Sequence, residues 1–365
     1  MVTLGREQVF SAIDPRWSEA LSHLRHDVYH TPAYHEVPGF GREGEACVFV
    51  HQEGDRVFLW PYLLTPTMGA SGCHDVTSVY GYSGPVSSPD AEFVARGWQG
   101  LLDHWRMQCV VSAFTRFHPI LGNHELVRGL RDAAGRPVDE GLRLCGSTVS
   151  LDLTIPPEEQ VRRYQKVLRQ EIRKSRESGF VTTLDEGWNH VEEFVAHYRS
   201  TMLRRNSRAA YLVDVAWVSE FRRCLGERAR LFVTKFNGEV AGALIAIEYG
   251  PFLHAHLTGI NSQLVAYSPL KVLLDDVRAW GATQGLKSFH LGGGLGGRAD
   301  TLYEFKRKFS PLTHEFYTGS WILEPARYRE LEAMHRRKLA QMGIDIGDPA
   351  FFPIYRYQPE LPISH

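Results

Sequence analysis

The sequence predicts an α/β (α+β) fold of two similar units, each a mostly antiparallel sheet flanked by helices. The chain has 365 residues, more than one ordinary hydrophobic core accommodates. Hairpin signals and amphipathic helices occur in the same order in both halves. Each half also has a long helix with a tryptophan near its C-terminal end, Trp105 and Trp280. We therefore expect a duplication that is visible in element order rather than in residue identity.

The first half contains a predicted β-hairpin over residues 47–64, which turns near residues 53–55. A short strand at 76–80, a helix at 91–107 and a strand at 109–114 follow. The same succession of hairpin, strand, helix and strand is expected again in the second half.

The second half starts with an extended segment at residues 148–153. Pro156 and Pro157 then open a helix that we expect to run to a stop at Gly179. One face of this helix is apolar. That face is formed by Tyr164, Val167, Leu168 and Ile172.

The remaining elements of the second half follow from local signals. Asn237-Gly238 is the strongest short-range hairpin signal and predicts a hairpin over residues 231–247. The other expected elements are helices at 188–204 and 269–283, strands at 253–258, 287–291 and 315–322, a basic helix before the last strand, and a polar helix at 325–343.

These elements predict an N-terminal domain at residues 1–147, a C-terminal catalytic domain at 148–324, and a helix and tail at 325–365. No apolar run approaches the roughly 20 residues that span a bilayer. The N-terminus lacks the basic and apolar regions of a signal peptide. The five cysteines are scattered and form no CxxC pair, which fits a reduced cytoplasm with neither a disulfide framework nor a zinc site. A cytoplasmic location is expected.

The most informative stretch is residues 288–311, where a short strand breaks into five glycines within six residues. These are Gly292, Gly293, Gly294, Gly296 and Gly297. Glycine loses much conformational freedom on folding, so such a cluster indicates that backbone comes close to another group. A glycine loop between a strand and a basic helix is where proteins hold carbonyls, carboxylates or phosphates.

The glycines also fit the GxGxxG pattern of dinucleotide-binding folds. That fold needs a second βαβ half downstream, and the about 70 remaining residues supply none. A Walker A loop is absent, because no lysine followed by serine or threonine succeeds the glycines. A nucleotide cofactor is therefore not favoured.

Metal and nucleophile chemistry has little support. His254 and His256 are two apart, so on a regular strand both would face the same way and could ligate a metal. No third ligand has a convincing spacing, and two strand histidines beside a cleft are the more ordinary interpretation. No GxSxG elbow occurs, and no cysteine has an obvious histidine partner. We expect no metal.

Two basic segments remain open to a binding or a structural interpretation. Seven basic residues lie between Arg162 and Arg176 with one acid, Glu171, which suits either a solvated face or contact with phosphate or RNA. Lys306 lies between Phe305 and Phe309, which would partly desolvate its ammonium and strengthen its pull on an oxyanion. The plainer interpretation turns both phenylalanines inward and leaves the lysine in water.

The succession of segments resembles the FemA/FemB/FemX aminoacyltransferases, which contain two GNAT-like domains. Seven segments match in order over some 230 residues. They are Tyr80-Gly-Tyr82-Ser-Gly-Pro-Val, Phe114-Thr-Arg-Phe-His-Pro, Thr148-Val-Ser-Leu-Asp-Leu, Arg169-Gln-Glu-Ile-Arg173-Lys, Asn237-Gly-Glu-Val-Ala-Gly, Thr258-Gly, and the glycine loop with Phe305-Lys306.

The resemblance implies transfer of an aminoacyl group from aminoacyl-tRNA to an amine, which forms an amide. By position, Lys306 and Phe305 would be catalytic and would hold the ester carbonyl and its oxyanion. The resemblance places substrate binding at Arg169, Arg173, Tyr211, His256, Gly292, Gly293, Gly294, Tyr80 and Tyr82. It implies aminoacyl-tRNA as co-substrate and no further cofactor, membrane span or DNA. Because the ester is already activated, alignment with the amine supplies much of the rate.

The chain departs from members of the family that act on peptidoglycan precursors. Those members place an aromatic residue and a lysine near the N-terminus to hold a nucleotide-sugar pyrophosphate. Here the segment at residues 29–35 is followed by no lysine before Lys166, and Ser83 stands where a basic residue is common. We expect a small metabolite or natural-product intermediate as the amine acceptor rather than a muropeptide.

Two alternatives remain. One is an acyl-CoA-dependent GNAT-type N-acyltransferase acting on an amino sugar or antibiotic. Coenzyme A would need a glycine-containing turn before the helix at 269–283, where Gln263 is followed by Val265 and Ala266. The other is a binding module on an inactive transferase fold, which predicts erosion of the glycine loop and of Lys306. Both are intact.

Overall fold

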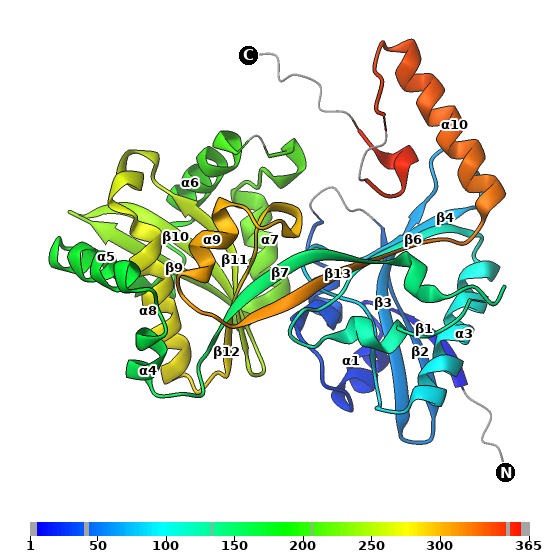
Figure 1. Ribbon diagram of the computed structural model, residues 1–365, viewed down its shortest axis with the longest axis horizontal. Helices are drawn as coiled ribbons and strands as arrows, with labels where there is room; N and C mark the ends of the chain where they lie inside the picture. Colours follow the sequence, from blue (N-terminus) through cyan, green and yellow to red (C-terminus); the bar gives the residue numbers. More distant parts are fainter. Residues whose placement is uncertain (1–5, 40–43, 133, 206, 348–350, 359–365) are drawn as a thin grey trace. The chain divides into compact units, whose positions relative to one another are not determined.

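The computed structural model describes residues 6–39, 44–132, 134–205, 207–347 and 351–358. The chain divides into two compact units (Figure 1). The first unit combines Met1–Leu144 with Tyr317–His365, and the second is Cys145–Phe316. The first five residues of the N-terminus that we assessed for a signal peptide lie outside the described residues. No helix among the described residues is long and apolar enough to cross a membrane.

The first unit contains a sheet with strand order β1-β2-β3-β4-β6-β13. Its strands are β1 (Arg6–Ser11), β2 (Glu45–Glu53), β3 (Arg56–Pro66), β4 (His74–Thr77), β5 (Val86–Ser87), β6 (Val110–Arg116) and β13 (Thr313–Ile322). β5 pairs with β3 beside this sheet, and β4 and β6 run parallel. Its α-helices are α1 (Pro15–Ser22), α2 (Pro32–His35), α3 (Ala91–Met107) and α10 (Pro325–Gln341).

Helix α3 covers the sheet of the first unit because one of its faces is strongly aromatic. Asp90 accepts a hydrogen bond from the N–H of Phe93 at 2.9 Å and so caps the helix. Trp98 and Trp105 of α3 are fully buried and pack against Trp60 of β3, with ring centroids 5.5 and 5.9 Å from it. Large aromatic side chains bury much area each, so this cluster is a major contribution to the core.

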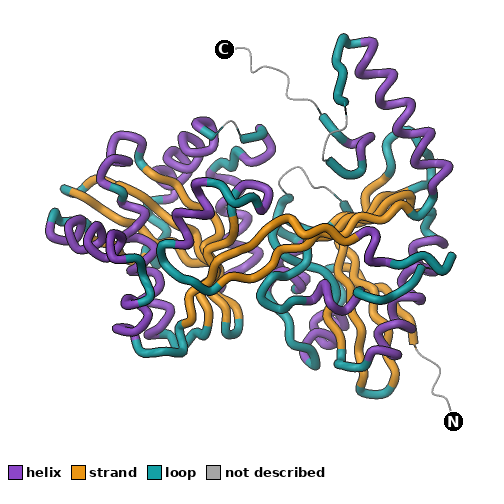
Figure 2. The backbone as a smooth tube through the Cα atoms, viewed as in Figure 1, coloured by secondary structure: helices purple, strands orange, loops and turns teal. Residues whose placement is uncertain are grey.

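The second unit has strand order β7-β12-β11-β10-β9-β8. Its strands are β7 (Leu142–Asp152), β8 (Val181–Leu184), β9 (Ala229–Phe236), β10 (Glu239–Tyr249), β11 (Phe252–Ile260) and β12 (Ser288–Gly293). Its α-helices are α4 (Pro157–Arg162), α5 (Lys166–Glu177), α6 (Val191–Arg204), α7 (Val215–Leu225), α8 (Pro269–Thr283) and α9 (Thr301–Arg307). Figure 2 shows strands and helices interleaved along the chain in both units.

The predicted fold class is confirmed, and the repeated element order is visible in both units. In the first unit, antiparallel β2, β3 and β4 lead through α3 to β6, which is parallel to β4. In the second, antiparallel β9, β10 and β11 lead through α8 to β12, which is parallel to β11. The hairpin turn at Asn237 and Gly238 has positive φ at both residues, as its sequence demands.

Two predictions about the elements are wrong, and some elements were not expected. The helix expected from Pro156 to Gly179 is broken into α4 and α5. The break occurs because Tyr164 turns inward to donate to Asp275 at 2.8 Å, while the N–H of Gln165 donates to the carbonyl of Lys308. Val167, expected on the apolar face, is 59% exposed. Strand β1 and helices α1 and α7 were not expected at all.

The domain division also differs from the expected ranges. Residues 317–365, expected partly in the second domain and partly as a separate tail, group with the first unit. The reason is that Thr318 to Ile322 of β13 pair with β6, and Tyr328 and Leu331 of α10 pack into a core cluster with Val111 of β6. The boundary expected near residue 147 lies close to the observed one at Leu144.

Candidate functional site

The parallel strands β11 and β12 of the second unit separate after a short shared segment. They pair only from Phe252 to His254 with Ser288 to His290. Beyond this point β11 has a β-bulge with His256 as its extra residue, because Ala246 faces Ala255 whereas Ile245 faces Leu257. A bulge bends its strand, which accounts for the end of the pairing. Diverging carboxyl ends of parallel strands are where α/β proteins bind ligands.

The glycine loop after β12 lies close against other backbone. A Cβ on Gly146 of β7 would lie 1.8 Å from the carbonyl oxygen of Gly297, and a Cβ on Gly294 would lie 2.1 Å from that of Arg298. Gly146 and Gly297 also have φ of +144° and +86°. Glycine is required at these positions both for space and for backbone conformation.

The N–H groups of this loop donate mainly within the loop. Asp300 caps α9 by accepting from Tyr303 N–H at 2.9 Å, and its other oxygen accepts from Leu295 N–H at 2.9 Å. Gly297 N–H donates to the carbonyl of Gly294. The loop therefore places α9 against β12 by close packing, and substrate contact by Gly292, Gly293 and Gly294 stays a prediction.

Lys306 of α9 donates a hydrogen bond from Nζ to the carbonyl of Gly293 at 2.7 Å. The contact joins the helix to the end of β12, where β11 and β12 have already separated. Burial, and secondly the charge of Arg205, lower the pKa of Lys306 to about 7, while Asp300 opposes this change. The ammonium is thus held in a poorly solvated environment, where it acts on a developing negative charge more strongly than in water.

Arg205 is a functional candidate that the sequence reasoning missed. It caps the C-terminus of α6, and its pKa is lowered mainly by burial, with Asp300 opposing. Two cations, Lys306 and Arg205, thus lie in the field of one carboxylate, Asp300. A site with surplus positive charge favours an anionic group. The sequence feature that could have pointed to Arg205 is the Arg204-Arg205 pair at the end of the helix expected at residues 188–204.

Phe305 points toward the core of the second unit. Its ring lies 5.6 Å from that of Phe309 in an edge-on contact, and Phe305 packs against the cluster formed by β7, β12, α5 and α8. The inward orientation that was the plainer alternative is therefore observed for the phenylalanines. Lys306, however, is directed to Gly293 rather than into water.

The two strand histidines have different neighbours. His254 Nδ1 lies 3.4 Å from His290 Nδ1, at the last paired position of β11 and β12. His256 stacks on Phe221 of α7 with centroids 5.2 Å apart, and burial lowers its pKa to about 3. The bulge interrupts the regular alternation of side chains between the two histidines, and the expectation that both face the same way stays a prediction. Tyr211 ends a short 3-10 helix, Ala209–Tyr211, and is half-buried.

Residues 162–307 match the family model described as acetyltransferase (GNAT) domain. Among solved structures, FemX superimposes with a TM-score of 0.66 at 11% identity, over 89% of this chain and 99% of that chain. The C-terminal domain (DUF2156) named as that of a lysylphosphatidylglycerol synthetase from Agrobacterium fabrum gives a TM-score of 0.51 at 15% identity, over 88% of this chain and 96% of that chain. No curated protein matches the chain.

The chain has a FemX-like fold, and residues 162–307 within it match a GNAT domain. The matched residues end one position after Lys306, so they include the bulged β11, the separated strand pair, the glycine loop and all of α9. The match supports acyl transfer, in the broad sense, as the activity of the second unit.

The basic helix α5 of the second unit is only partly paired with acids. Helix α5 packs against α8 (Figure 1), and Arg176 pairs with the buried Asp275 at 2.7 Å and with Asp276. Arg173 is 71% exposed and lies 3.6 Å from Glu177, while Arg169 donates to the carbonyl of Arg162 at 3.0 Å. The structure therefore places Arg169 and Arg173 on an exposed helix surface.

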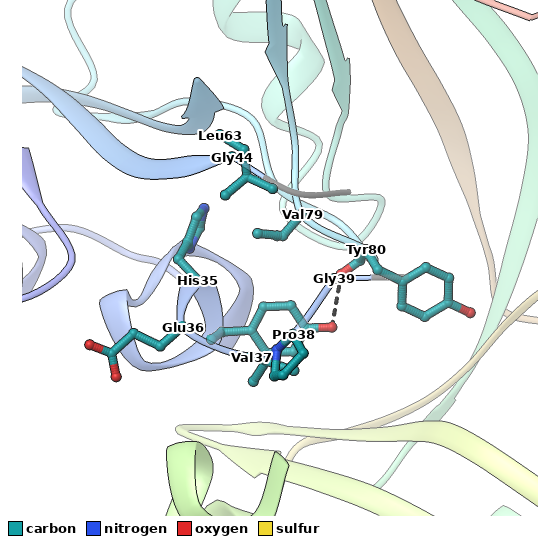
Figure 3. A pocket seen from close by; sticks show the side chains of 10 residues that line it. His35, Glu36, Val37, Pro38, Gly39, Gly44, Leu63, Val79 and Tyr80 are labelled. Atoms are coloured by element: carbon teal, nitrogen blue, oxygen red, sulfur yellow. Dashed lines mark hydrogen bonds between the residues drawn. The ribbon is translucent and has the colours of Figure 1, made fainter. Parts of the chain in front are cut away.

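Tyr80 and Tyr82 belong to the first unit. The carbonyl of Tyr80 accepts from the hydroxyl of Tyr34 at 2.8 Å, and Tyr82 makes an edge-on contact with Tyr29 at 5.7 Å. Burial raises the pKa of Tyr82. Figure 3 shows Tyr80 at one side of a cavity of about 250 Å³ in this unit. The cavity is lined by Tyr34, His35, Glu36, Val37, Pro38, Gly39, Gly44, Leu63, Val79 and Tyr80.

Proposed function

We propose that the protein is an aminoacyltransferase that moves an aminoacyl group from aminoacyl-tRNA to an amine. The broader activity, acyl transfer, is supported by the GNAT domain. The observation that carries the finer proposal is the hydrogen bond of 2.7 Å between Lys306 and Gly293 at the end of β12. This contact fixes a poorly solvated cation beside the point where two parallel strands separate.

The chemistry requires one bond to form and one to break. The amine nitrogen attacks the ester carbonyl, and a carbon–nitrogen bond forms as the carbonyl oxygen becomes an oxyanion. The carbon–oxygen bond to the ribose then breaks, the amide forms, and the proton lost by the amine passes to the ribose hydroxyl. Since the ester is activated, alignment of the reactants and stabilisation of the oxyanion are the main tasks of the protein.

Lys306 is suited to stabilise this oxyanion. Its ammonium has three donors, of which one is given to the carbonyl of Gly293. Arg205 adds a second positive charge nearby. The carboxylate of Asp300 compensates part of the positive charge of the two cations. We propose that Lys306 contacts the reacting carbonyl and that Arg205 supports the binding of the anionic tRNA end.

The segment before α8 argues against coenzyme A as donor. It forms a 3-10 helix, Ser262–Tyr267, and Ser268 has φ of +53° before Pro269. The N–H of Lys271 donates to the carbonyl of Ser268, and Pro269 has no N–H. The first turn of α8 thus offers few free donors for a pyrophosphate.

The acceptor is proposed to be a small-molecule amine. The cavity of about 250 Å³ in the first unit has mixed polar and apolar lining and suits a small ligand. The part of the chain that a muropeptide nucleotide would need for its pyrophosphate carries no lysine.

The test uses radiolabelled aminoacyl-tRNA with a panel of small amines, with and without RNase, and acetyl-CoA in parallel. We expect label in an amide product that RNase abolishes. Lys306→Ala should lower kcat by roughly a hundredfold or more, whereas Lys308→Ala, at the C-cap of the same helix, should leave kcat near the original value. Activity that survives RNase, or that requires acetyl-CoA, would refute the tRNA donor. A fully active Lys306→Ala would refute the role of Lys306.

A further inference from the structure

Cys73 and Cys109 lie opposite each other at the start of the parallel pair β4 and β6. His74 pairs with Val110, so the residues just before them are cross-strand neighbours. The N–H of His74 donates to the carbonyl of Cys109 at 3.1 Å and fixes this register. Neighbouring strands lie about 4.8 Å apart, within the Cα separation that disulfides span. The backbone alone thus places the two cysteines at crosslinking distance.

The side chains are directed toward each other. The Sγ atoms of Cys73 and Cys109 are 2.7 Å apart. Cys109 follows α3 and has φ of +50°, at a position after a helix where glycine is usual. A non-glycine residue in this conformation costs about 1 kcal/mol. The backbone alone would favour glycine at this position, which makes the Cys109 side chain a candidate for a functional role.

We infer that Cys73 and Cys109 form a redox-modification site, in which a peroxide oxidises the two thiols to a disulfide. Cys109 is half-buried and Cys73 is 5% exposed, so Cys109 meets the oxidant first. Its thiolate attacks one peroxide oxygen, the O–O bond breaks, and a sulfenic acid forms with release of water. The sulfur of Cys73 then attacks that of Cys109, the S–S bond forms, and a second water leaves. Overall, two thiols and hydrogen peroxide give one disulfide and two waters.

The order of attack agrees with the environment of the two thiols. The hydrogen bond with Cys109, and then burial, raise the pKa of Cys73. A raised pKa lowers the thiolate fraction and slows direct oxidation. Cys73 therefore acts as the resolving thiol rather than the first to react.

The crosslink would tie the turn after β3 to the end of α3. Both cysteines pack in one cluster with Tyr328 and Leu331 of α10 and with Tyr355 near the C-terminus. The disulfide would close a loop whose ends are 36 positions apart and would restrict the unfolded chain. Oxidation would thus stabilise the part of the first unit on which the C-terminal helix docks.

The test treats the purified full-length protein with hydrogen peroxide at submillimolar concentration. Peptide mapping without reductant is expected to find Cys73 linked to Cys109, with loss of two of the five thiols. The Tm should rise on the order of 10 °C and return to its starting value with dithiothreitol. Cys224→Ser, which removes a half-buried thiol of α7, should respond as the original protein does.

Cys109→Ser and Cys73→Ser should each abolish the linked peptide and the rise in Tm. Cys109→Gly, which suits the backbone at this position, should fold and also lose both responses. Equal oxidation of all five cysteines, over-oxidation of Cys109 without a link, or an unchanged rise in Tm in the Cys109→Gly variant would each overturn the inference.

Discussion

Lys306 must keep its proton in order to stabilise an oxyanion, and its pKa of about 7 makes that proton removable near neutral pH. Below pH 7 the side chain is charged, and above it the neutral form increases. If the cation is the active form, kcat falls about tenfold for each pH unit above 7. Lys306→Arg keeps its charge throughout this range. The ratio of the original kcat to that of Lys306→Arg should therefore fall as pH rises from 7 to 9.

Titration of the acceptor amine affects both proteins equally, so it cancels in the ratio of their kcat values. The measurement is initial rates with one aminoacyl-tRNA and one amine between pH 6 and 9, with Lys308→Arg as control. A ratio that rises with pH would mean that neutral Lys306 acts as a base. A flat ratio would mean that Lys306 does not titrate in the reaction.

At the scale of single residues, sequence reasoning singled out Lys306 because the Phe-Lys pair beside the glycine loop has a recognisable pattern. It could not find Arg205, whose interaction with Lys306 depends on how α6 and α9 are placed. The proximity of Cys73 and Cys109 depends likewise on the register of β4 and β6. Such contacts join residues distant in sequence, and no local pattern encodes them.

At the scale of elements, the glycine loop depends on its approach to β7. Gly146→Ala would force a Cβ to within 1.8 Å of the Gly297 carbonyl oxygen, so backbone must shift. We expect a loss of unfolding free energy of about 3 kcal/mol and a large loss of activity as α9 moves. Gly296→Ala is the matched control, since φ is +62° but no atom lies within 4 Å of the added Cβ.

Gly296→Ala should lower the free energy of unfolding by about 1 kcal/mol, because only the backbone conformation is unfavourable for alanine. Urea unfolding of both variants gives the comparison, with Lys306-dependent activity measured alongside. Equal losses in the two variants would show that the close approach of Gly146 to the loop does not govern its stability.

Helix α5 offers a second test at this scale. Lys166 and Lys174 form no ion pair with a described residue, and Arg169 donates only to a backbone carbonyl. If this surface binds tRNA phosphate, Arg169→Ala should weaken binding and reduce the slope of log affinity against log salt by about 1. Arg223→Ala on α7, which removes an exposed arginine paired with Glu220, serves as control. An unchanged slope for Arg169→Ala, measured by filter binding, would mark α5 as a solvated surface.

Most elements followed from local signals, and the exceptions have tertiary causes. Helix α8 has the predicted bounds because Pro269 starts it and its apolar face is regular. The break between α4 and α5 arises from the bond of Tyr164 to Asp275, which lies on another helix. The bulge at His256 is set by pairing with β10. Neither interaction leaves a trace in the periodicity of its own segment.

At the scale of the whole molecule, the chain leaves the first unit after Leu144 and returns to it at Tyr317. The sequence indicated two units but placed the last 49 residues in the second domain and a separate tail, because their partners in the first unit lie about 200 positions earlier. The pairing of β13 with β6 attaches this last part of the chain to the first unit. The C-terminal segment, residues 351–358, adds contacts through Ile354 and Tyr355. The first unit therefore needs both ends of the chain to complete its core.

Asp75 of β4 attaches the C-terminal segment to the first unit through polar contacts. Its carboxylate accepts from Tyr355 Oη at 2.5 Å, Ser112 Oγ at 2.7 Å and Arg356 Nε at 2.7 Å. In Asp75→Asn, either the amide NH₂ or the uncharged amide oxygen would face Arg356. In both cases the largely buried ion pair with Arg356 is lost. We expect a loss of about 3 kcal/mol in unfolding free energy and faster tryptic cleavage after Arg356. Tyr355→Phe removes one neutral donor and should cost only about 1 kcal/mol.

Urea unfolding and timed proteolysis of the two variants separate an anchor from a simple packing contact. If Asp75 holds the C-terminal segment, cleavage after Arg356 accelerates at urea concentrations well below the unfolding midpoint of Asp75→Asn. Because Arg356 also donates to the carbonyl of Pro66 at 2.6 Å, the segment keeps a second attachment, and the rest of the first unit should stay folded under these conditions. Cleavage that begins only at the midpoint would show that the C-terminal segment and the sheet unfold together, and that Asp75 is no separate anchor.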